Sequence, residues 1–155
     1  MIRTYRESDR AALRKITTIC FEKVCIDRNI EDHFGAVGGT DWTDRKRRHI
    51  DADIADCPEG ILIVEQEGKV AGYISCRLDT ETRIGHIANL AVLPACQGRG
   101  LGRQLMLAAL ELMKARGMEL ARIETLEQND VGSNFYPKMG FVEVARQIHY
   151  AMPLV

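Results

Sequence analysis

The stretch Asn89-Leu90-Ala91-Val92-Leu93-Pro94-Ala95-Cys96-Gln97-Gly98-Arg99-Gly100-Leu101-Gly102 carries the strongest structural signal in the sequence. The apolar run over 84–93 predicts a strand that ends at Pro94. Three glycines then alternate with other residues, so the backbone can approach a ligand closely. A helix with regularly spaced apolar residues is predicted directly after them. Because a helix N-terminus attracts anions, the strand, turn and helix together predict a cradle for a pyrophosphate group.

Two common nucleotide-binding signatures are excluded at this turn. The pattern G-x-G-x-x-G would require a glycine where Arg103 stands, if it started at Gly98. The pattern GxxxxGK[ST] is absent, which argues against a P-loop kinase or GTPase. Arg99 and Arg103 would add positive charge at the rim of the cradle. A glycine-rich turn can also be a purely structural bend. Further motifs in the sequence are therefore needed to distinguish a phosphate-binding turn from a structural one.

The composition is typical of a soluble globular domain. The 155 residues include 46% hydrophobic and 28% charged residues, and we expect one domain over 1–155. The 21 basic and 22 acidic residues give a net charge of -1, which favours neither nucleic acid nor an anionic membrane as partner. No apolar run approaches the ~20 residues that span a bilayer. The first residues lack a signal-peptide core, so we expect a cytoplasmic protein.

The cysteines and histidines suggest no metal site. The five cysteines form no CxxC pair, and the four histidines are scattered without ligand spacing. We therefore expect small, buried or half-buried thiols in a reducing compartment, with a reactive or metal-bound cysteine as the alternative.

Hydrophobic periodicity predicts a layered α/β (α+β) fold with a mixed sheet and about four flanking helices. The loop over 35–40 is rich in glycine and is expected to be mobile. The predicted strands are 1–6, 61–65, 70–78, 84–93, 120–126, 141–146 and 148–152, and the predicted helices are 9–24, 42–56, 101–116 and 131–139.

The helix over 42–56 carries the one local charge cluster, Asp44-Arg45-Lys46-Arg47-Arg48. This run predicts a solvated helix face, and the alternatives are a site for an acidic or phosphorylated partner or for nucleic acid. Acidic residues in the N-terminal half are equally consistent with solvated positions or with attraction of a cationic amine. They are Glu31, Asp32, Asp41, Asp44, Asp51, Asp53 and Asp56.

The glycine turn resembles the acyl-CoA signature [RQ]-x-x-G-x-[GA] of the GNAT superfamily of N-acetyltransferases. Gln97, Gly100 and Gly102 fill its three defined positions. The resemblance covers most of the chain. It implies a mostly antiparallel central sheet with a splayed central strand.

A second motif further along the chain strengthens this resemblance. The family pattern there is an asparagine, a short helix, and a tyrosine close to Gly-Phe. Asn129, Tyr136 and Gly140-Phe141 match it in type and spacing. Ser133 and Pro137 depart from the commoner residues, but neither change removes a reacting group.

The resemblance implies acetyl-CoA as the acyl donor, with no metal, and a primary amine on a small molecule or a protein as acceptor. The fold often forms dimers, so a homodimer is possible. A non-catalytic acyl-CoA sensor is the competing hypothesis. The resemblance also implies which residues contact acetyl-CoA. Backbone groups of Leu90, Ala91 and Val92 would contact the pantetheine arm, and the pyrophosphate would be held by Gln97, Gly98, Arg99, Gly100, Leu101, Gly102 and Arg103. Asn129 would contact the CoA arm, although a role as a helix cap explains it equally well.

The resemblance also implies three catalytic candidates. Tyr136 is the candidate general acid, since a phenol can protonate the leaving thiolate. His86 and Glu124 are the candidate general bases, because an amine must lose a proton before it reacts. A histidine stands at the place of His86 in aromatic-amine acetyltransferases of the family. Each role has an alternative. Tyr136 could be an ordinary packing residue, and His86 and Glu124 could be ordinary surface residues. A chain of water molecules could also serve as the base.

Overall fold

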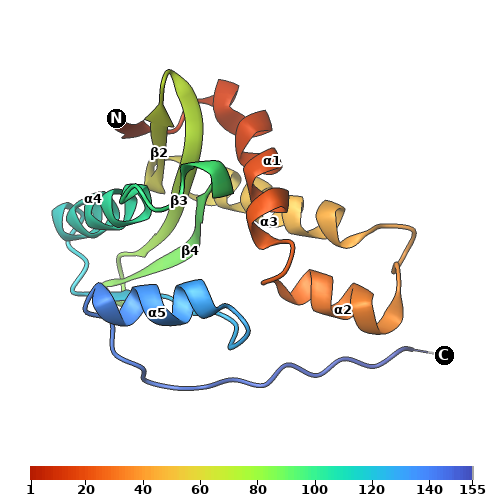
Figure 1. The fold of residues 1–155 in the computed structure, drawn as a ribbon. Coiled ribbons are helices and arrows are strands. Elements are labelled where there is room, and N and C mark those ends of the chain that lie inside the picture. The colour runs from red at the N-terminus through yellow and green to blue at the C-terminus, as the bar shows by residue number, and fades with distance from the viewer. Residues whose placement is uncertain (155) are drawn as a thin grey trace.

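The computed structural model describes residues 1–154 and contains one five-stranded sheet flanked by helices (Figure 1). The strand order is β1-β2-β3-β4-β5, in which β5 alone runs parallel to its neighbour. The strands are β1 Ile2–Thr4, β2 Ile61–Gln66, β3 Lys69–Asp79, β4 Ile84–Val92 and β5 Leu120–Arg122. The helices are α1 Arg10–Phe21, α2 Ile26–Phe34, α3 Trp42–Asp56, α4 Leu101–Ala115 and α5 Asp130–Lys138, and short 3₁₀ turns cover Glu7–Asp9, Pro58–Gly60 and Pro94–Cys96.

Helices cover both faces of the sheet, so the core has two parts. On one face α4 buries Leu105, Met106 and Ala109 against β2, β3 and β4. On the other face α1 and α3 bury Leu13 and Ile50, among others, against the same strands. Figure 1 shows α4 on one side of the sheet and α1 and α3 on the other. The mixed, mostly antiparallel layered fold that the sequence predicts is confirmed.

The hairpin between β2 and β3 shows how local sequence sets this architecture. Glu67 and Gly68 both have positive φ, 52° and 73°, as a two-residue hairpin turn requires. The alternation of the flanking strands then sends Ile61 and Ile63 to the α1 and α3 side and Leu62 and Val64 to the α4 side. Both sets are buried because helices cover both faces.

Three sequence-based expectations about the elements are wrong or incomplete. Residues 141–146 and 148–152 were expected as strands, but residues 139–154 form no strand because this segment pairs with no sheet edge. Helix α2 was not predicted, so residues 1–154 contain five α-helices rather than about four. The edge strand β5 ends at Arg122 and not near 126, because its partner β4 diverges from it there.

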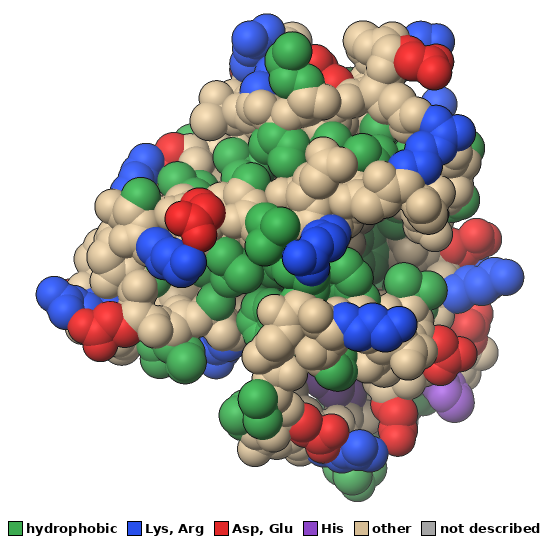
Figure 2. All heavy atoms as spheres, turned by 60° about the vertical axis from the view of Figure 1, so that its left-hand side comes forward, with side chains coloured by type: hydrophobic (Ala, Val, Ile, Leu, Met, Phe, Trp, Pro, Cys, Tyr) green, Lys and Arg blue, Asp and Glu red, His purple; other side chains and the backbone are tan. Residues whose placement is uncertain are grey.

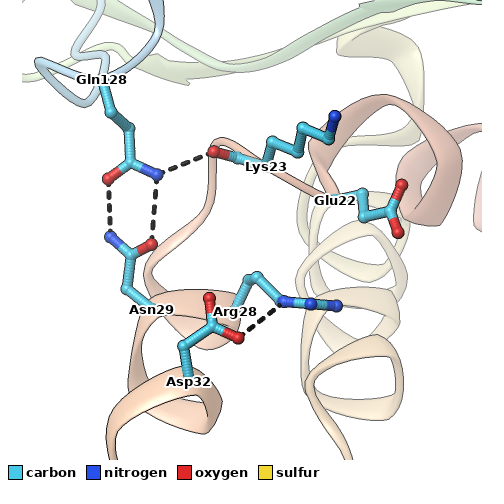
Figure 3. Close-up of a pocket in the computed structure, with 6 residues that line it drawn as sticks. All are labelled: Glu22, Lys23, Arg28, Asn29, Asp32 and Gln128. Carbon is cyan, nitrogen blue, oxygen red and sulfur yellow. Dashed lines mark hydrogen bonds and ion pairs between the residues drawn. The ribbon is translucent and has the colours of Figure 1, made fainter.

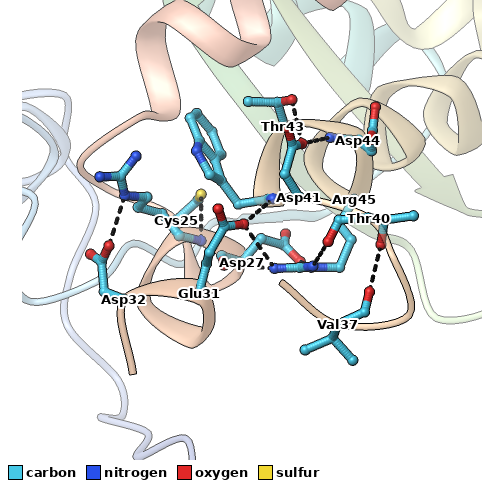
Figure 4. Close-up of polar contacts among 12 residues, drawn as sticks. Cys25, Asp27, Glu31, Asp32, Val37, Thr40, Asp41, Thr43, Asp44 and Arg45 are labelled. Carbon is cyan, nitrogen blue, oxygen red and sulfur yellow. Dashed lines mark hydrogen bonds and ion pairs between the residues drawn. The ribbon is translucent and has the colours of Figure 1, made fainter. Parts of the chain in front are cut away.

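The basic run in α3 is not a uniformly solvated face. Arg45 turns toward α2, where it pairs with Asp27 at 3.5 Å and with Glu31 at 3.6 Å (Figure 4). Its Nη1 also donates to the carbonyl of Thr40 at 2.9 Å. Lys46 points inward and is only 8% exposed. The expectation of a solvated face therefore fails for Lys46, which lies one helical turn after the buried Trp42.

The loop over 35–40 forms a compact turn. Val37 and Thr40 exchange two backbone hydrogen bonds, of 3.3 and 3.1 Å, around Gly38 and Gly39. Both glycines have positive φ, 61° and 72°, which this two-residue turn requires. The turn delivers the chain to Asp41, whose carboxylate caps α3 by accepting from the amide of Asp44.

Candidate functional site

Strands β4 and β5 separate after three paired residues, and this separation creates the site. Their pairing ends at His86 and Arg122. Further along β4, Ala88 is an extra residue between the paired positions of Ile87 and Asn89, which forms a bulge against β3. Beyond the bulge the edge of β4 that faces away from β3 has no strand beside it within residues 1–154. The predicted splayed strand is therefore present.

The glycine turn lies at the end of this open strand. No carbonyl or side chain of the described residues accepts a hydrogen bond from the six consecutive backbone amides of residues 98–103. Gly98 and Gly100 have φ of 76° and 75°, and no atom lies within 4 Å of where their Cβ atoms would be. Gln97 fastens the turn to β4, since its Nε2 donates to the carbonyl of Val92 at 2.9 Å.

These free amides fit an anionic group. They include the first amides of α4, which has no side-chain cap at Gly100. The N-terminus of a 15-residue helix adds a partial positive charge at the same place. Arg99 and Arg103 belong to the same turn, and Arg103 also contacts the sulfur of Met139 at 3.4 Å. The turn is thus open, positive and able to donate several hydrogen bonds, as a pyrophosphate requires.

His86 and Glu124 meet at the point where the strands part. The Nε2 atom of His86 lies 2.9 Å from Oε1 and 3.0 Å from Oε2 of Glu124. The histidine side chain is 23% exposed and that of the glutamate 66%. The two residues are 38 positions apart in the sequence, and the structure brings them together through the parallel pairing of β4 and β5. The sequence identified each residue separately but did not predict their contact.

A hollow of about 300 Å³ opens beside His86, on the face of the sheet that α3 covers. Its walls come from α3, β3 and β4, including Ala52, Asp53, Arg77 and Asn89. The hollow therefore connects the buried polar groups under α3 with the half-buried imidazole of His86. It is a candidate place for a second substrate.

The floor of this hollow is a buried polar network that the sequence did not reveal. Asp53, only 2% exposed, accepts from Ser75 at 2.7 Å, from Asn89 at 2.7 Å and from Arg77 at 2.6 Å. Asp53 was expected to be as readily solvated as the other acidic residues, and for this residue solvation is wrong. The available signal was its helical spacing, because Asp53 follows Lys46 and Ile50 on the face of α3 that also carries Ile54.

Lys46 is a further member of the buried polar network around Asp53 and Asn89. Its Nζ donates to Oδ1 of Asn89 at 3.1 Å and lies 4.2 Å from the ring centre of Phe21. No carboxylate of the described residues lies within 4 Å of this ammonium group. Burial lowers the pKa of Lys46, because the charged form loses hydration without gaining a direct counter-ion.

Tyr136 lies on α5 and packs against the apolar core on the α4 side of the sheet. Its ring meets Phe135 and Phe141 edge to face, with ring centres 5.5 and 6.0 Å away. Burial raises the pKa of Tyr136 to about 12, so the phenol stays protonated at neutral pH. Its hydroxyl has no hydrogen-bond partner among residues 1–154. The structure shows no direct contact between Tyr136 and the pair formed by His86 and Glu124.

Asn129 is engaged as the cap of α5. Its Oδ1 accepts from the amide of Gly132 at 3.1 Å, and its Nδ2 donates to the hydroxyl of Thr125 at 2.9 Å. A Cβ atom on Gly132 would lie 2.8 Å from both of these side chains and 3.1 Å from the ring of Tyr136. Gly132 is therefore required for the close packing that places Tyr136, and a direct contact of Asn129 with a cofactor stays a prediction.

A second, smaller hollow of about 190 Å³ lies between α2 and the loop before α5 (Figure 3). Asn29 and Gln128 face each other there with two amide hydrogen bonds of 2.8 and 3.1 Å. Gln128 also donates to the carbonyl of Lys23 at 2.7 Å. These contacts join the segment after α1 to the segment that follows β5, and they hold the helical N-terminal half against the candidate site.

The remaining polar groups offer no competing centre in the described part of the chain. Within residues 1–154 no cluster of three or more His, Cys, Asp or Glu side chains is arranged to hold a metal ion. The predicted buried and half-buried thiols are confirmed, and burial raises the pKa of Cys76 to about 12 and that of Cys20 to about 11. On the face shown in Figure 2, acidic and basic side chains are intermixed rather than gathered into one basic surface. None of the described helices is long and apolar enough to cross a membrane.

Comparison with known families agrees with this geometry. A family profile described as the acetyltransferase (GNAT) family matches residues 11–141. This chain belongs to the GNAT family. The match includes the open strand, the glycine turn, His86, Glu124 and Tyr136.

Individual relatives of this GNAT chain are distant. N-alpha-acetyltransferase 30 of Schizosaccharomyces pombe is 30% identical over 96 residues, which cover 60% of this chain and 64% of that protein. Mycothiol acetyltransferase of Nocardia farcinica is 28% identical over 157 residues, which cover 97% of this chain and 48% of that protein. This chain therefore spans less than two thirds of the length of either relative.

Solved structures share the GNAT fold at low sequence identity. PaiA N-acetyltransferase from Thermoplasma acidophilum in complex with coenzyme A matches with a TM-score of 0.72 and 19% identity, over 90% of this chain and 87% of that one. A GNAT acetyltransferase from Brucella melitensis in complex with acetyl-CoA matches with a TM-score of 0.64 and 22% identity, over 92% and 82%. At these identities the likeness shows the fold alone.

Proposed function

We propose that this GNAT chain is an N-acetyltransferase that moves an acetyl group from acetyl-CoA to a primary amine, both bound at once. The observation that carries the proposal is the arrangement around the open half of β4. A turn with six free amides lies at one end of it, and the contact between His86 and Glu124 lies at the other. The solved relatives that contain coenzyme A or acetyl-CoA support this donor.

The residues present fit acetyl-CoA. Backbone amides of Gly98, Arg99, Gly100, Leu101, Gly102 and Arg103 would hold the pyrophosphate, because they have no protein acceptor among the described residues. The open edge of Leu90, Ala91 and Val92 would pair with the pantetheine arm as a further strand does. An amide on this edge would also donate to the thioester carbonyl, where negative charge develops during transfer.

Acetyl-CoA supplies an activated acetyl group, whose transfer forms a carbon–nitrogen bond and releases a thiolate. Two proton transfers accompany this reaction: the leaving thiolate gains a proton and the attacking amine loses one. Tyr136, with a pKa of about 12, is protonated at neutral pH and would give its proton to the leaving sulfur. His86 would take the proton that the amine loses, and Glu124 would hold the imidazole in place.

The hollow beside His86 is the acceptor site in this proposal, because it is adjacent to the imidazole and lies under α3. Its volume of about 300 Å³ has room for a small amine or the end of a peptide. The named relatives include an N-alpha-acetyltransferase and a mycothiol acetyltransferase, which supports an amine acceptor of either kind.

Calorimetric titration of the purified chain with acetyl-CoA tests the donor first, with ATP and NAD as controls. Saturable binding of acetyl-CoA at micromolar concentration and weak binding of both controls are expected. Absence of acetyl-CoA binding would mean that the glycine turn is structural, and the enzyme proposal would be wrong. A non-catalytic acyl-CoA sensor would bind acetyl-CoA but would not acetylate any amine. The contact between His86 and Glu124 favours an enzyme over such a sensor.

A further inference from the structure

The hollow beside His86 is lined mainly by basic side chains. Lys46, Arg48 and Arg77 belong to its walls, whereas Asp53 is the one carboxylate that residues 1–154 contribute to the lining. The whole chain has a net charge of -1, so the basic excess is a property of the hollow and not of the composition. A cavity with an excess of one charge attracts a ligand group of the opposite charge.

The carboxylate of Asp53 is fully engaged inside the fold. Its Oδ1 accepts two hydrogen bonds from Arg77, at 2.6 and 3.1 Å, and its Oδ2 accepts from Ser75 and Asn89, both at 2.7 Å. A carboxylate offers about four acceptor positions, so Asp53 has none left for a further cation. It therefore balances the charge of Arg77 but not that of the other basic residues of the hollow.

Lys46 is a buried cation without a direct counter-ion among the described residues. It is only 8% exposed, and its Nζ makes one hydrogen bond, to Oδ1 of Asn89 at 3.1 Å, although an ammonium group can donate three. The ring of Phe21, 4.2 Å away, compensates only part of the charge. Because burying an unpaired charge destabilises a fold, such a group in the wall of an open hollow indicates a ligand that supplies the missing anion.

Arg48 continues the basic wall at the exposed rim of the hollow, and it too pairs with no carboxylate of residues 1–154. The other two members of the basic run in α3 are paired. Arg45, which Figure 4 shows turned toward α2, lies 3.5 Å from a carboxylate there, and Arg47 lies 3.3 Å from another. The two members of the run that line the hollow are thus the two that lack an acidic partner.

The bulge in β4 brings this basic wall and the imidazole to one face of the sheet. In a regular strand His86 and Asn89, three residues apart, would point to opposite faces. Ala88 is the extra residue of the bulge, so both side chains line the hollow. Three residues at about 3.3 Å each separate their Cα atoms by roughly 10 Å at most. A single small molecule can therefore reach from the imidazole to the ammonium group of Lys46.

The end of the hollow at His86 has the opposite charge. The carboxylate of Glu124 lies 2.9 Å from Nε2 of the histidine, and its side chain is 66% exposed. A carboxylate at this place attracts an amine in its protonated form, before the amine gives up its proton. The site is therefore negative at the end where transfer is proposed and positive at the end formed by Lys46 and Arg48.

We infer, on the basis of the proposed function, that the acceptor is a small amine with a carboxylate at its far end. The amine lies at His86 and the carboxylate pairs with Lys46 and Arg48. In the reaction the carbon–nitrogen bond forms, the carbon–sulfur bond of acetyl-CoA breaks, and the amine proton passes to His86. The thiolate takes a proton from Tyr136, and the carboxylate of the acceptor stays unchanged.

This assignment disfavours diamines and polyamines as acceptors. Their second ammonium group would lie against Lys46, where like charges repel. The volume of the hollow, about 300 Å³, is at the lower end for ligand sites and suits an amino acid of a few carbons.

Three acceptors of equal length that differ only at the far end test the inference. γ-Aminobutyrate ends in a carboxylate, its amide in a neutral group, and putrescine in a second ammonium group. The kcat/KM of the wild-type chain is expected to be at least about tenfold higher for the acid than for the amide, and lowest for putrescine. β-Alanine and ε-aminocaproate, each with its amide, extend the comparison to a shorter and a longer chain.

Lys46→Met shows whether the preference comes from the buried ammonium group. The variant is expected to lower kcat/KM for the acid by about 10- to 100-fold and to leave that for the amide unchanged. Arg47→Met is the matched control, since it removes one positive charge from the outer side of α3 and is expected to keep the preference. Urea unfolding checks that both variants are folded. An equal loss for acid and amide in Lys46→Met would overturn the inference, because Lys46 would then act only on the structure.

Failure of the inference and failure of the proposed function give different results. If the wild-type chain acetylates the amides and putrescine as efficiently as the acids, the inference is wrong and the proposed function stands. If it binds acetyl-CoA but acetylates no amine, the proposed function is wrong. The hollow is then tested by NMR titration of the chain, saturated with coenzyme A, with γ-aminobutyrate. A shift of the side-chain amide of Asn89 that Lys46→Met abolishes would support the carboxylate site, and no shift would overturn it.

Discussion

The Nε2 atom of His86 lies 2.9 Å from the carboxylate of Glu124, at the line where β4 and β5 part. Only one of the two side chains is well exposed, since the histidine is 23% and the glutamate 66% accessible. A carboxylate on Nε2 favours the form of the ring that carries its hydrogen on Nε2, which leaves Nδ1 free to accept a proton. The contact therefore fixes both the orientation of the ring and the nitrogen that can act as a base.

Replacing His86 by alanine is expected to lower kcat for acetyl transfer by about 10²-fold, the usual contribution of a general base. Glu124→Gln keeps an acceptor oxygen near Nε2 but loses the charge, and a loss of about tenfold is expected. The affinity for acetyl-CoA should not change in either variant, because the glycine turn is untouched. Steady-state kinetics with calorimetry would separate the two effects, and His33→Ala is the control histidine. Unchanged kcat in His86→Ala would leave water as the base.

Tyr136→Phe removes the proposed acid while retaining the ring that packs edge to face on Phe135 and Phe141. A loss of about 10² to 10⁴ in kcat is expected, with unchanged affinity for acetyl-CoA and unchanged thermal stability. Single-turnover measurements would check this loss directly. If the variant kept full activity, Tyr136 would be a packing residue and another group or solvent would protonate the thiolate.

Gly100→Ala tests the glycine turn against a control with the same backbone geometry. Gly100 and Gly117 both have positive φ, 75° and 79°, with open space at the position of Cβ. Each substitution is expected to cost about 1–2 kcal/mol of stability from the left-handed backbone. Only Gly100→Ala is expected to weaken acetyl-CoA binding, by about tenfold, which calorimetry would measure. Equal affinity in both variants would remove the turn from the binding site.

The local signals in the sequence were enough to predict the sheet, the glycine turn and the α5 region. Glycines at positive φ and alternating apolar residues act over a few positions, so they can be recognised without the fold. Helix α2 was missed because none of its residues is buried, and its contacts with α3 depend on ion pairs such as that of Arg45 with Asp27. Its apolar residues Ile26, Ile30 and Phe34 do recur at helical spacing, so a signal was present, but it extends over only nine residues.

Contacts between distant segments could not be predicted in this way. The His86–Glu124 pair requires the parallel pairing of β4 with β5, and the Asp53 network requires α3 to lie across the bulge at Ala88. Residues 142–154 show the opposite case. Their alternation predicted strands that the structure does not contain, because a strand needs a sheet edge to pair with and this segment pairs with none among residues 1–154.

Lys46→Met tests the electrostatics of the buried network through its pH dependence. Burial lowers the pKa of Lys46 in the folded chain below the value of about 10.4 for an unfolded lysine. Between these two pKa values the unfolded chain binds more protons, so the contribution of Lys46 to stability improves as the pH rises. Below the folded pKa, the full cost of burying an ammonium group without a direct carboxylate partner is present. Methionine carries no charge and has no such dependence.

We therefore expect Lys46→Met to be as stable as the wild type or about 1 kcal/mol more stable near neutral pH, despite losing the hydrogen bond to Asn89. This difference should shrink, and then favour the wild type, as the pH approaches about 10. Urea unfolding of both proteins between about pH 6 and pH 10 would measure it, with Arg47→Met as the control for an ion-paired residue on the outer side of α3. A free-energy difference that stayed constant across this range would show that the folded chain does not depress the pKa of Lys46.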